Sequence, residues 1–228
     1  DQSTNSNDFT LGAGTLTATE DCPDDVFATW NNLDNYDADG TFSNGNTSLQ
    51  TSAGNESFNT STLGDSKGKY YFEMKLISNS GSDKTRVGIT SVVTTATDDW
   101  LGKTATSWGY SQEGLVTNDN STLSGTFASY TDDDIIGIAM DLDNNRLFFS
   151  KNGTWQNSAD PTSSTGALSI TASETYFFGL GDETGGYSIT QSNFGNGYFA
   201  TTAISSAGTN ASGIGIFEYD VPTGYTAL

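Results

Sequence analysis

Apolar and polar side chains alternate most regularly in the stretch GKYYFEMKLIS, between Gly68 and Ser78. One side of this stretch carries the large apolar residues, Tyr70, Phe72, Met74 and Leu76, and the other carries Tyr71, Glu73 and Lys75. A period of two residues is that of a β-strand with one face on a core. The pattern therefore predicts a strand over these residues.

A second regular stretch, DIIGIAMDLDNNRLFFSKNG, runs from Asp134 to Gly153 and predicts two strands joined at Asp143-Asn144-Asn145, a composition typical of tight turns. Its core-facing positions are expected to be Ile136, Ile138, Met140 and Leu142. The alternate positions, Ile135, Gly137, Ala139 and Asp141, are expected to face outward or to meet another layer. No catalytic pair lies along this hairpin, which we interpret as scaffold.

Further short strands are predicted where apolar runs lie between turn-forming residues. They are TRVGITSVV, SWGYSQEGLV, TYFFGLG, YSITQSNFG and a last one in GIFEYDVP. No convincing helix of ten or more residues interrupts them, and no repeat of fixed period is visible. The predicted fold is all-β, a two-sheet antiparallel β-sandwich with loop-rich flanks.

The ends of the chain differ from this central region. Residues 1–20 are rich in Ser, Thr and Asn and predict a polar N-terminal arm. Residues 21–67 predict lead-in strands and loops packed on the sandwich, in which the Asn and Asp density outweighs a helical spacing of Phe27, Trp30, Leu33 and Tyr36. Residues 197–228 form a C-terminal flank, for which a closing strand is expected.

Charge and composition exclude several classes of function. Eight basic residues against 28 acidic ones give a formal net charge of -20, which disfavours nucleic acid and anionic membranes as partners. There is no His, so imidazole catalysis is excluded. Cys22 is the single cysteine, which excludes an internal disulfide, and beside Asp21 and Asp24 it is interpreted as a small apolar residue. Apolar runs are far shorter than the roughly 20 residues that span a bilayer.

The ordered landmarks GKYYFEMKL, RVGITS, WGYSQEG, YTDDDIIGIAMDLDNNRLFFSKNG, TYFFGLGD and QSNFG resemble those of the SPRY domain, a concanavalin A-like jelly-roll sandwich. They place a SPRY-like core at residues 68–196. The resemblance implies a non-enzymatic binding module whose loops contact protein partners. The flanks resemble those of SPRY-containing virion structural proteins of tailed phages, especially marine ones, which implies a place on a virion surface.

Candidate catalytic and metal sites are weak. The concanavalin A-like sandwich also hosts glycoside hydrolases, which use two carboxylates about 5 to 9.5 Å apart. Here Glu73 and Glu113 are isolated, so no enzymatic activity is expected. Asp37 and Asp39 alternate before Gly40 as in a calcium loop, but the bidentate Glu is missing, and a turn is the favoured interpretation. No cofactor is predicted, with a structural calcium ion as the alternative.

Loop aromatics are the better candidates for binding, because Trp and Tyr offer large rigid contact areas. The candidate binding-loop residues are Asp98, Asp99, Trp100, Trp155, Tyr198 and Phe199. The competing interpretation is that these aromatics cap the open ends of the sandwich. Tyr110 is interpreted as structural, and Trp108 is left open between the two roles.

Two hypotheses of function follow. The leading one is a capsid decoration, fibre or tail component that contacts other virion proteins and copies of itself, with host glycan or protein as a further partner. Its prediction is that deletion of residues 1–20 weakens assembly without unfolding the sandwich. The alternative is a secreted or cell-surface, lectin-like adhesin in which Trp100 or Trp155 stacks on a sugar ring.

Overall fold

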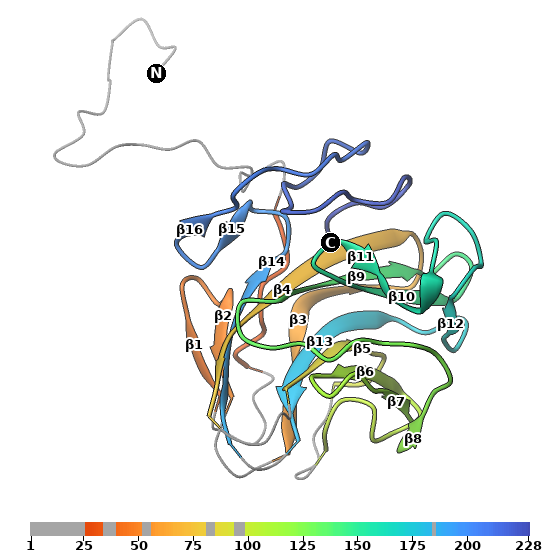
Figure 1. Cartoon of the computed structure of the whole chain (residues 1–228), viewed down its shortest axis with the longest axis horizontal. Helices are drawn as coiled ribbons and strands as arrows, with labels where there is room; N and C mark the ends of the chain where they lie inside the picture. The colour runs from red at the N-terminus through yellow and green to blue at the C-terminus, as the bar shows by residue number, and fades with distance from the viewer. Residues whose placement is uncertain (1–25, 34–39, 52–55, 81–84, 94–98, 184–185) are drawn as a thin grey trace, which may run out of the picture.

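Two antiparallel sheets face each other in the computed structural model, which describes residues 26–33, 40–51, 56–80, 85–93, 99–183 and 186–228 (Figure 1). The first sheet has the order β1 (Thr41–Ser43), β2 (Ser48–Gln50), β14 (Ser188–Asn193), β4 (Lys69–Asn79), β9 (Ile135–Asp141), β10 (Arg146–Lys151) and β11 (Thr154–Trp155), and β12 (Leu168–Ser169) also pairs with β10. The second has the order β3 (Ser57–Asp65), β13 (Tyr176–Asp182), β5 (Thr85–Thr90), β6 (Ser107–Ser111), β7 (Val116–Asn118) and β8 (Ser121–Thr122).

The remaining regular elements are short. The strands β15 (Tyr198–Phe199) and β16 (Thr202–Ala203) form a small hairpin, and Gln156–Ser158 forms a single 3-10 turn. The predicted all-β antiparallel sandwich is therefore confirmed. Among the described residues, no helix is long and apolar enough to cross a membrane.

The core lies between the sheets and is rich in aromatic rings. Phe72 of β4 and Phe178 of β13 stack with ring centroids 4.8 Å apart, which joins the first sheet to the second. Trp30, from the segment before β1, is fully buried, and its ring meets those of Phe72 and Phe194 edge to face. Such contacts add about 1 kcal/mol each to the burial of the rings.

The lead-in residues are part of the sandwich. β1 and β2 extend the first sheet beside β14, and β3 forms an edge of the second sheet beside β13. Trp30 pairs with Ser61 of β3, whereas Leu33 is 92% exposed. Residues 1–25, Tyr36, Asp37 and Asp39 lie outside the described residues, so the structure does not test the predictions made for the arm, Cys22 and the calcium-like turn.

Residues 204–228, the part of the C-terminal flank that follows β16, cover part of the outer face of the first sheet (Figure 1). The Tyr71 N–H donates to Thr226 O at 2.8 Å, and the Thr226 N–H donates to Lys69 O at 3.1 Å. Phe217 is 1% exposed, with its ring 5.0 Å from that of Tyr71. Because of this third layer, all seven residues of β9 are buried, including those expected to face outward or to meet another layer.

The closing strand predicted in GIFEYDVP is wrong. Within residues 215–222, the only β-type pairing in the structure is an isolated bridge between Ile216 and Asn196. The apolar periodicity of this segment comes from single buried side chains, such as Phe217 and Val221, and not from strand pairing. Side chains of the sheet bind part of its backbone, so a strand ladder is not needed to satisfy those groups.

Candidate functional site

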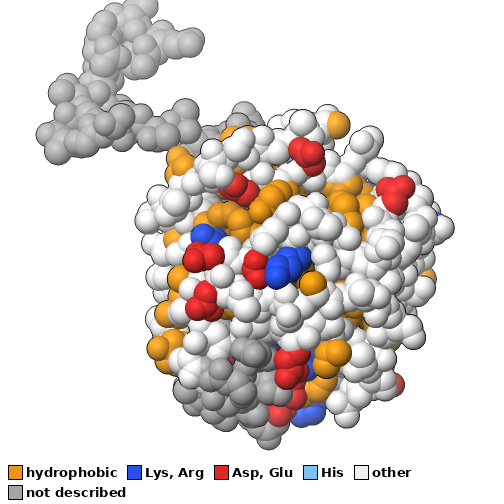
Figure 2. Space-filling view, viewed as in Figure 1, with side chains coloured by type: hydrophobic (Ala, Val, Ile, Leu, Met, Phe, Trp, Pro, Cys, Tyr) orange, Lys and Arg blue, Asp and Glu red, His pale blue; other side chains and the backbone are white. Residues whose placement is uncertain are grey.

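A groove of about 380 Å³ lies between the β15–β16 hairpin and the outer face of the first sheet. It is lined by Lys75, Ile77, Ile135, Gln191, Phe199, Thr202, Ala203, Ile204, Ser205 and Glu218. The face drawn in Figure 2, which carries the hairpin and the C-terminal flank, shows a band of hydrophobic side chains. The apolar part of the groove thus comes from three segments, β4, β9 and residues 199–204, which are distant in sequence.

The charged side chains of the groove are already paired within the chain. Lys75 Nζ lies 3.0 Å from an oxygen of Asp133. The Glu218 carboxylate accepts hydrogen bonds from the N–H of Ser205, at 2.7 Å, and from the Ser205 hydroxyl. A charged ligand would have to compete with these contacts, whereas an apolar side chain would not. The groove is therefore suited to an uncharged, apolar occupant.

An open strand edge borders the groove. Among the described strands, β16 pairs only with β15, and both of its residues, Thr202 and Ala203, are exposed. Backbone groups at such an edge can pair with an added extended segment. The groove thus combines apolar side chains in its lining with an edge that can bind main chain.

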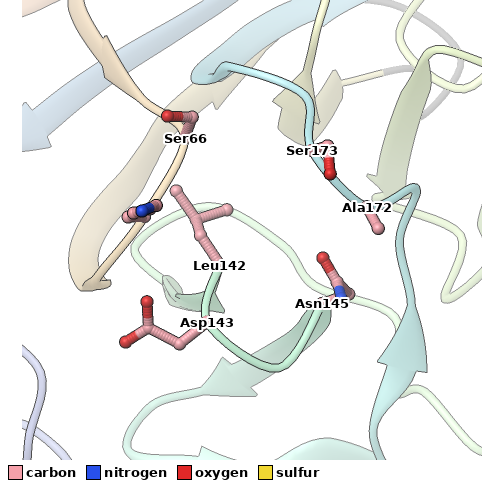
Figure 3. A pocket seen from close by; sticks show the side chains of 7 residues that line it. Ser66, Leu142, Asp143, Asn145, Ala172 and Ser173 are labelled. Carbon is pink, nitrogen blue, oxygen red and sulfur yellow. The ribbon is translucent and has the colours of Figure 1, made fainter.

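A second cavity, of about 480 Å³, lies where three turns meet at one end of the sandwich. Figure 3 shows Ser66, Leu142, Asp143, Asn145, Ala172 and Ser173 around it. Leu142 and Ala172 are its apolar residues, and one oxygen of Asp143 accepts the Gly68 N–H at 2.9 Å, an interaction within the turns themselves. It offers less apolar surface than the groove, so we take the groove as the candidate site.

Trp100 was predicted to be an exposed binding residue, but it is only 7% exposed. Its ring lies 4.1 Å from the Arg86 guanidinium, a cation–π contact on the outer face of the second sheet. The next residue, Leu101, is fully buried over Gly109 and Gly179, where a Cβ would collide with it. The segment is held against the sheet, and Trp100 has little surface left for stacking on a sugar.

The other predicted residues lie elsewhere. Trp155 in β11 is half-buried, with its ring 6.3 Å from that of Tyr71. Phe199 is 5% exposed and lines the groove, and Tyr198 beside it is half-buried. Asp99 is half-buried, and Asp98 is outside the described residues. Trp100 packs on Arg86 of the second sheet, with Asp99 next to it in the chain, whereas Trp155 lies in the first sheet and Tyr198 and Phe199 form one strand of the separate β15–β16 hairpin. The predicted residues therefore do not form one site, and their binding role stays a prediction.

Sequence reasoning missed the role of Glu73, which is fully buried under the C-terminal flank. Its carboxyl accepts the N–H groups of Glu218 and Tyr219, each at 2.9 Å, and the Tyr71 hydroxyl at 3.1 Å. Burial raises the pKa of Glu73 to about 7, although these three hydrogen bonds each lower it. A lone Glu on the polar side of a strand was the available signal.

Asp182, at the end of β13, is a second buried carboxyl. It is 2% exposed, and neither of its oxygens has a partner with good hydrogen-bond geometry among the described residues. Burial raises the pKa of Asp182 to about 7, and the Thr51 hydroxyl opposes this change. Such a group favours its neutral form inside the protein.

The acidic turn before β9 forms ion pairs with lysines. Asp133 pairs with Lys75 at 3.0 Å, and Asp134 pairs with Lys151 at 2.9 Å. In the part of the chain that the structure describes, no group of three or more acidic, His or Cys side chains is placed to hold a metal ion. The prediction of no cofactor, with calcium as the alternative, stays a prediction.

Comparison with known proteins agrees with this architecture. The family model of the SPRY domain matches residues 69–202. The crystal structure of the SPRY domain of human HERC1 aligns over 67% of this chain and 91% of its own, with 20% identity and a TM-score of 0.54. The stonustoxin structure aligns over 74% of this chain and 27% of its own, with 17% identity and a TM-score of 0.54. Curated protein sequences give no match.

Proposed function

Because this chain belongs to the SPRY domain family, whose members are generally protein–protein interaction modules, we propose that it is a non-enzymatic binding protein and that its groove is the contact site. The occupant is an extended segment of a protein partner that inserts apolar side chains. The observation that carries this proposal is the groove itself, in which half of the ten lining residues are apolar and the lysine and the glutamate are paired within the chain.

The binding mode follows from the edge of β16. An extended segment beside Thr202 and Ala203 would form main-chain hydrogen bonds, and its alternate side chains would point toward Ile77 and Phe199. The net charge of -20 favours neutral or basic partners over acidic ones. The partner class is therefore a protein segment with apolar residues and few carboxylates.

A library of displayed random linear peptides tests this proposal with a probe that needs no known partner. Peptides with apolar residues should be enriched on the wild-type chain and lose binding to Ile77→Gln. The matched control is Ile189→Gln, because Ile189 is also half-buried on the outward side of the first sheet but does not line the groove. Equal binding to both variants, or no enrichment at all, contradicts the proposal.

The biological setting that we propose is the surface of a virion, as a capsid decoration, fibre or tail component that contacts other virion proteins and copies of itself. The likeness of the flanks to those of phage virion proteins and the strong acidity support this setting. Electron microscopy of particles from the source culture, labelled with an antibody against this chain, tests it. Label on cell envelopes with bare particles would contradict the virion setting and leave the binding proposal standing.

A further inference from the structure

The C-terminal flank is held to the first sheet by hydrogen bonds between its backbone and two side chains of the sheet, Glu73 and Asn193. Two successive N–H groups, of Glu218 and Tyr219, point at the two oxygens of Glu73. Two residues earlier, the Ile216 carbonyl accepts a hydrogen bond from Asn193 Nδ2 at 2.9 Å. The same amide nitrogen is 3.5 Å from Glu73. Side chains of β4 and β14 thus provide the partners that a neighbouring strand would otherwise provide.

This anchor contains a buried acid without a basic partner among the described residues. The ion pairs of the described side chains do not include Glu73. Within the described part of the chain, the titratable groups that face it are Tyr71 on its own strand and Glu218 and Tyr219 on the flank. The Glu218 carboxylate is bound to Ser205. Without a cation, a buried carboxylate is costly in its ionised form.

We propose that Glu73 is a pH-sensitive latch of the C-terminal flank, which holds the flank more tightly when its carboxyl is neutral than when it is ionised. The flank would cover Glu73 in the docked state and expose it to water in the open state. Docking would then take up a proton at neutral pH, and the open state would release it.

The direction and size of the pH effect on docking follow from the pKa of Glu73 in water and under the flank. In water the Glu73 pKa is near its ordinary value of 4.5, and under the flank burial raises it to about 7. The docked state therefore binds more protons between these pH values, and docking weakens as the pH rises through this range. The difference corresponds to a change of roughly two orders of magnitude in the docking equilibrium, with no further change above about pH 8.

Neighbouring hydroxyls can satisfy both protonation states. With Glu73 ionised, the Tyr71 hydroxyl donates to it, as observed at 3.1 Å. With Glu73 neutral, its own O–H can donate to Tyr71, which then donates to the buried Ser150 hydroxyl, whose oxygen has no other hydrogen bond to a described residue. Gly137 leaves the space for this chain, because a Cβ there would lie 2.7 Å from the Tyr71 hydroxyl oxygen.

The latch also acts next to the candidate site. Glu218, whose N–H binds Glu73, lines the groove and holds Ser205, another lining residue. Undocking of the flank would move Glu218 and Ser205 away from the groove that they line. This consequence rests on the proposed function, whereas the latch itself does not.

Amide hydrogen exchange measured by NMR on the full chain tests the latch. Protection factors, which are corrected for the intrinsic effect of pH, should fall 10-fold or more for the Glu218 and Tyr219 amides between pH 5.5 and 8.5. In Glu73→Gln, a neutral side chain of similar shape, these protection factors should not depend on pH. Asp182→Asn removes the other buried carboxyl with a raised pKa and should keep the wild-type response.

Two results would overturn the latch. One is a wild-type protection factor of the Glu218 and Tyr219 amides that is the same or higher at pH 8.5 than at pH 5.5. This comparison needs no variant. The other is a pH response that persists in Glu73→Gln. Neither result depends on peptide binding, so failure of the latch and failure of the proposed function are distinguishable.

Discussion

Replacing Asp182 with Asn removes a buried carboxyl from the end of β13, in register with Thr85 of β5. In the unfolded chain this carboxyl ionises near its ordinary pKa of 3.8, and in the folded chain burial raises the pKa to about 7. The native state therefore binds more protons between these values, so the contribution of Asp182 to the free energy of unfolding falls as the pH rises from about 4 to about 7.

The size of this effect follows from the same two values. One pKa unit is worth about 1.4 kcal/mol, so the rise from 3.8 to about 7 sets an upper limit of about 4 kcal/mol. Local relaxation of the structure around the ionised Asp182 reduces this cost. We therefore expect Asp182→Asn to be about 2 to 4 kcal/mol more stable than wild type at pH 8. At pH 4 both side chains are largely neutral, and the two proteins should agree within about 1 kcal/mol.

Urea unfolding followed by tryptophan fluorescence, at intervals from pH 4 to 8.5, measures this difference. Asp132→Asn, the same substitution at an exposed position, is the matched control for the loss of one negative charge. Lower stability of Asp182→Asn at pH 8 would refute the reasoning. It would mean that the ionised carboxylate has a stabilising partner.

Two further substitutions test the packing. Phe217→Ala removes a ring that is 1% exposed and leaves a cavity beneath the flank. We expect the free energy of unfolding to fall by about 3 kcal/mol and the Tm to fall by about 6 to 12 °C. A fall in Tm below about 2 °C would mean that the flank does not unfold with the sandwich. Gly109→Ala places a Cβ 2.7 Å from the Leu101 carbonyl carbon, so we expect a loss of at least about 2 kcal/mol in urea unfolding, and unchanged stability would contradict the close packing of that segment.

The short-range pattern predicted most of the sandwich because strand pairing and core burial leave a period of two along the chain. β5, β6, β9, β10 and β14 lie within predicted strands, and β4 and β13 each run one residue past the end of theirs. The same pattern misled at GIFEYDVP, where apolar residues of an irregular segment imitate a strand. The family landmarks were confirmed because they lie in the core strands, where local residues are enough to identify the fold.

The candidate site was less predictable. Phe199 was named from the sequence and lines the groove, but Ile77, Ile135 and Glu218 were not named as binding residues. Nothing near Ile77 in the chain indicates that residues 199–205 will form the opposite wall. Trp100 looked like an exposed loop residue because its contact with Arg86 is not visible as a pattern in either segment.

The alternation in β4 by itself determined that Phe72 and Met74 face the core, since a strand with two such side chains on one side buries that side. The fate of Glu73, on the other side, was decided only by the tertiary structure. The residues that cover and bind it, Glu218 and Tyr219, follow it by 145 and 146 positions. The pKa of Glu73 depends on that distant cover, because burial raises it and burial is a property of the folded chain.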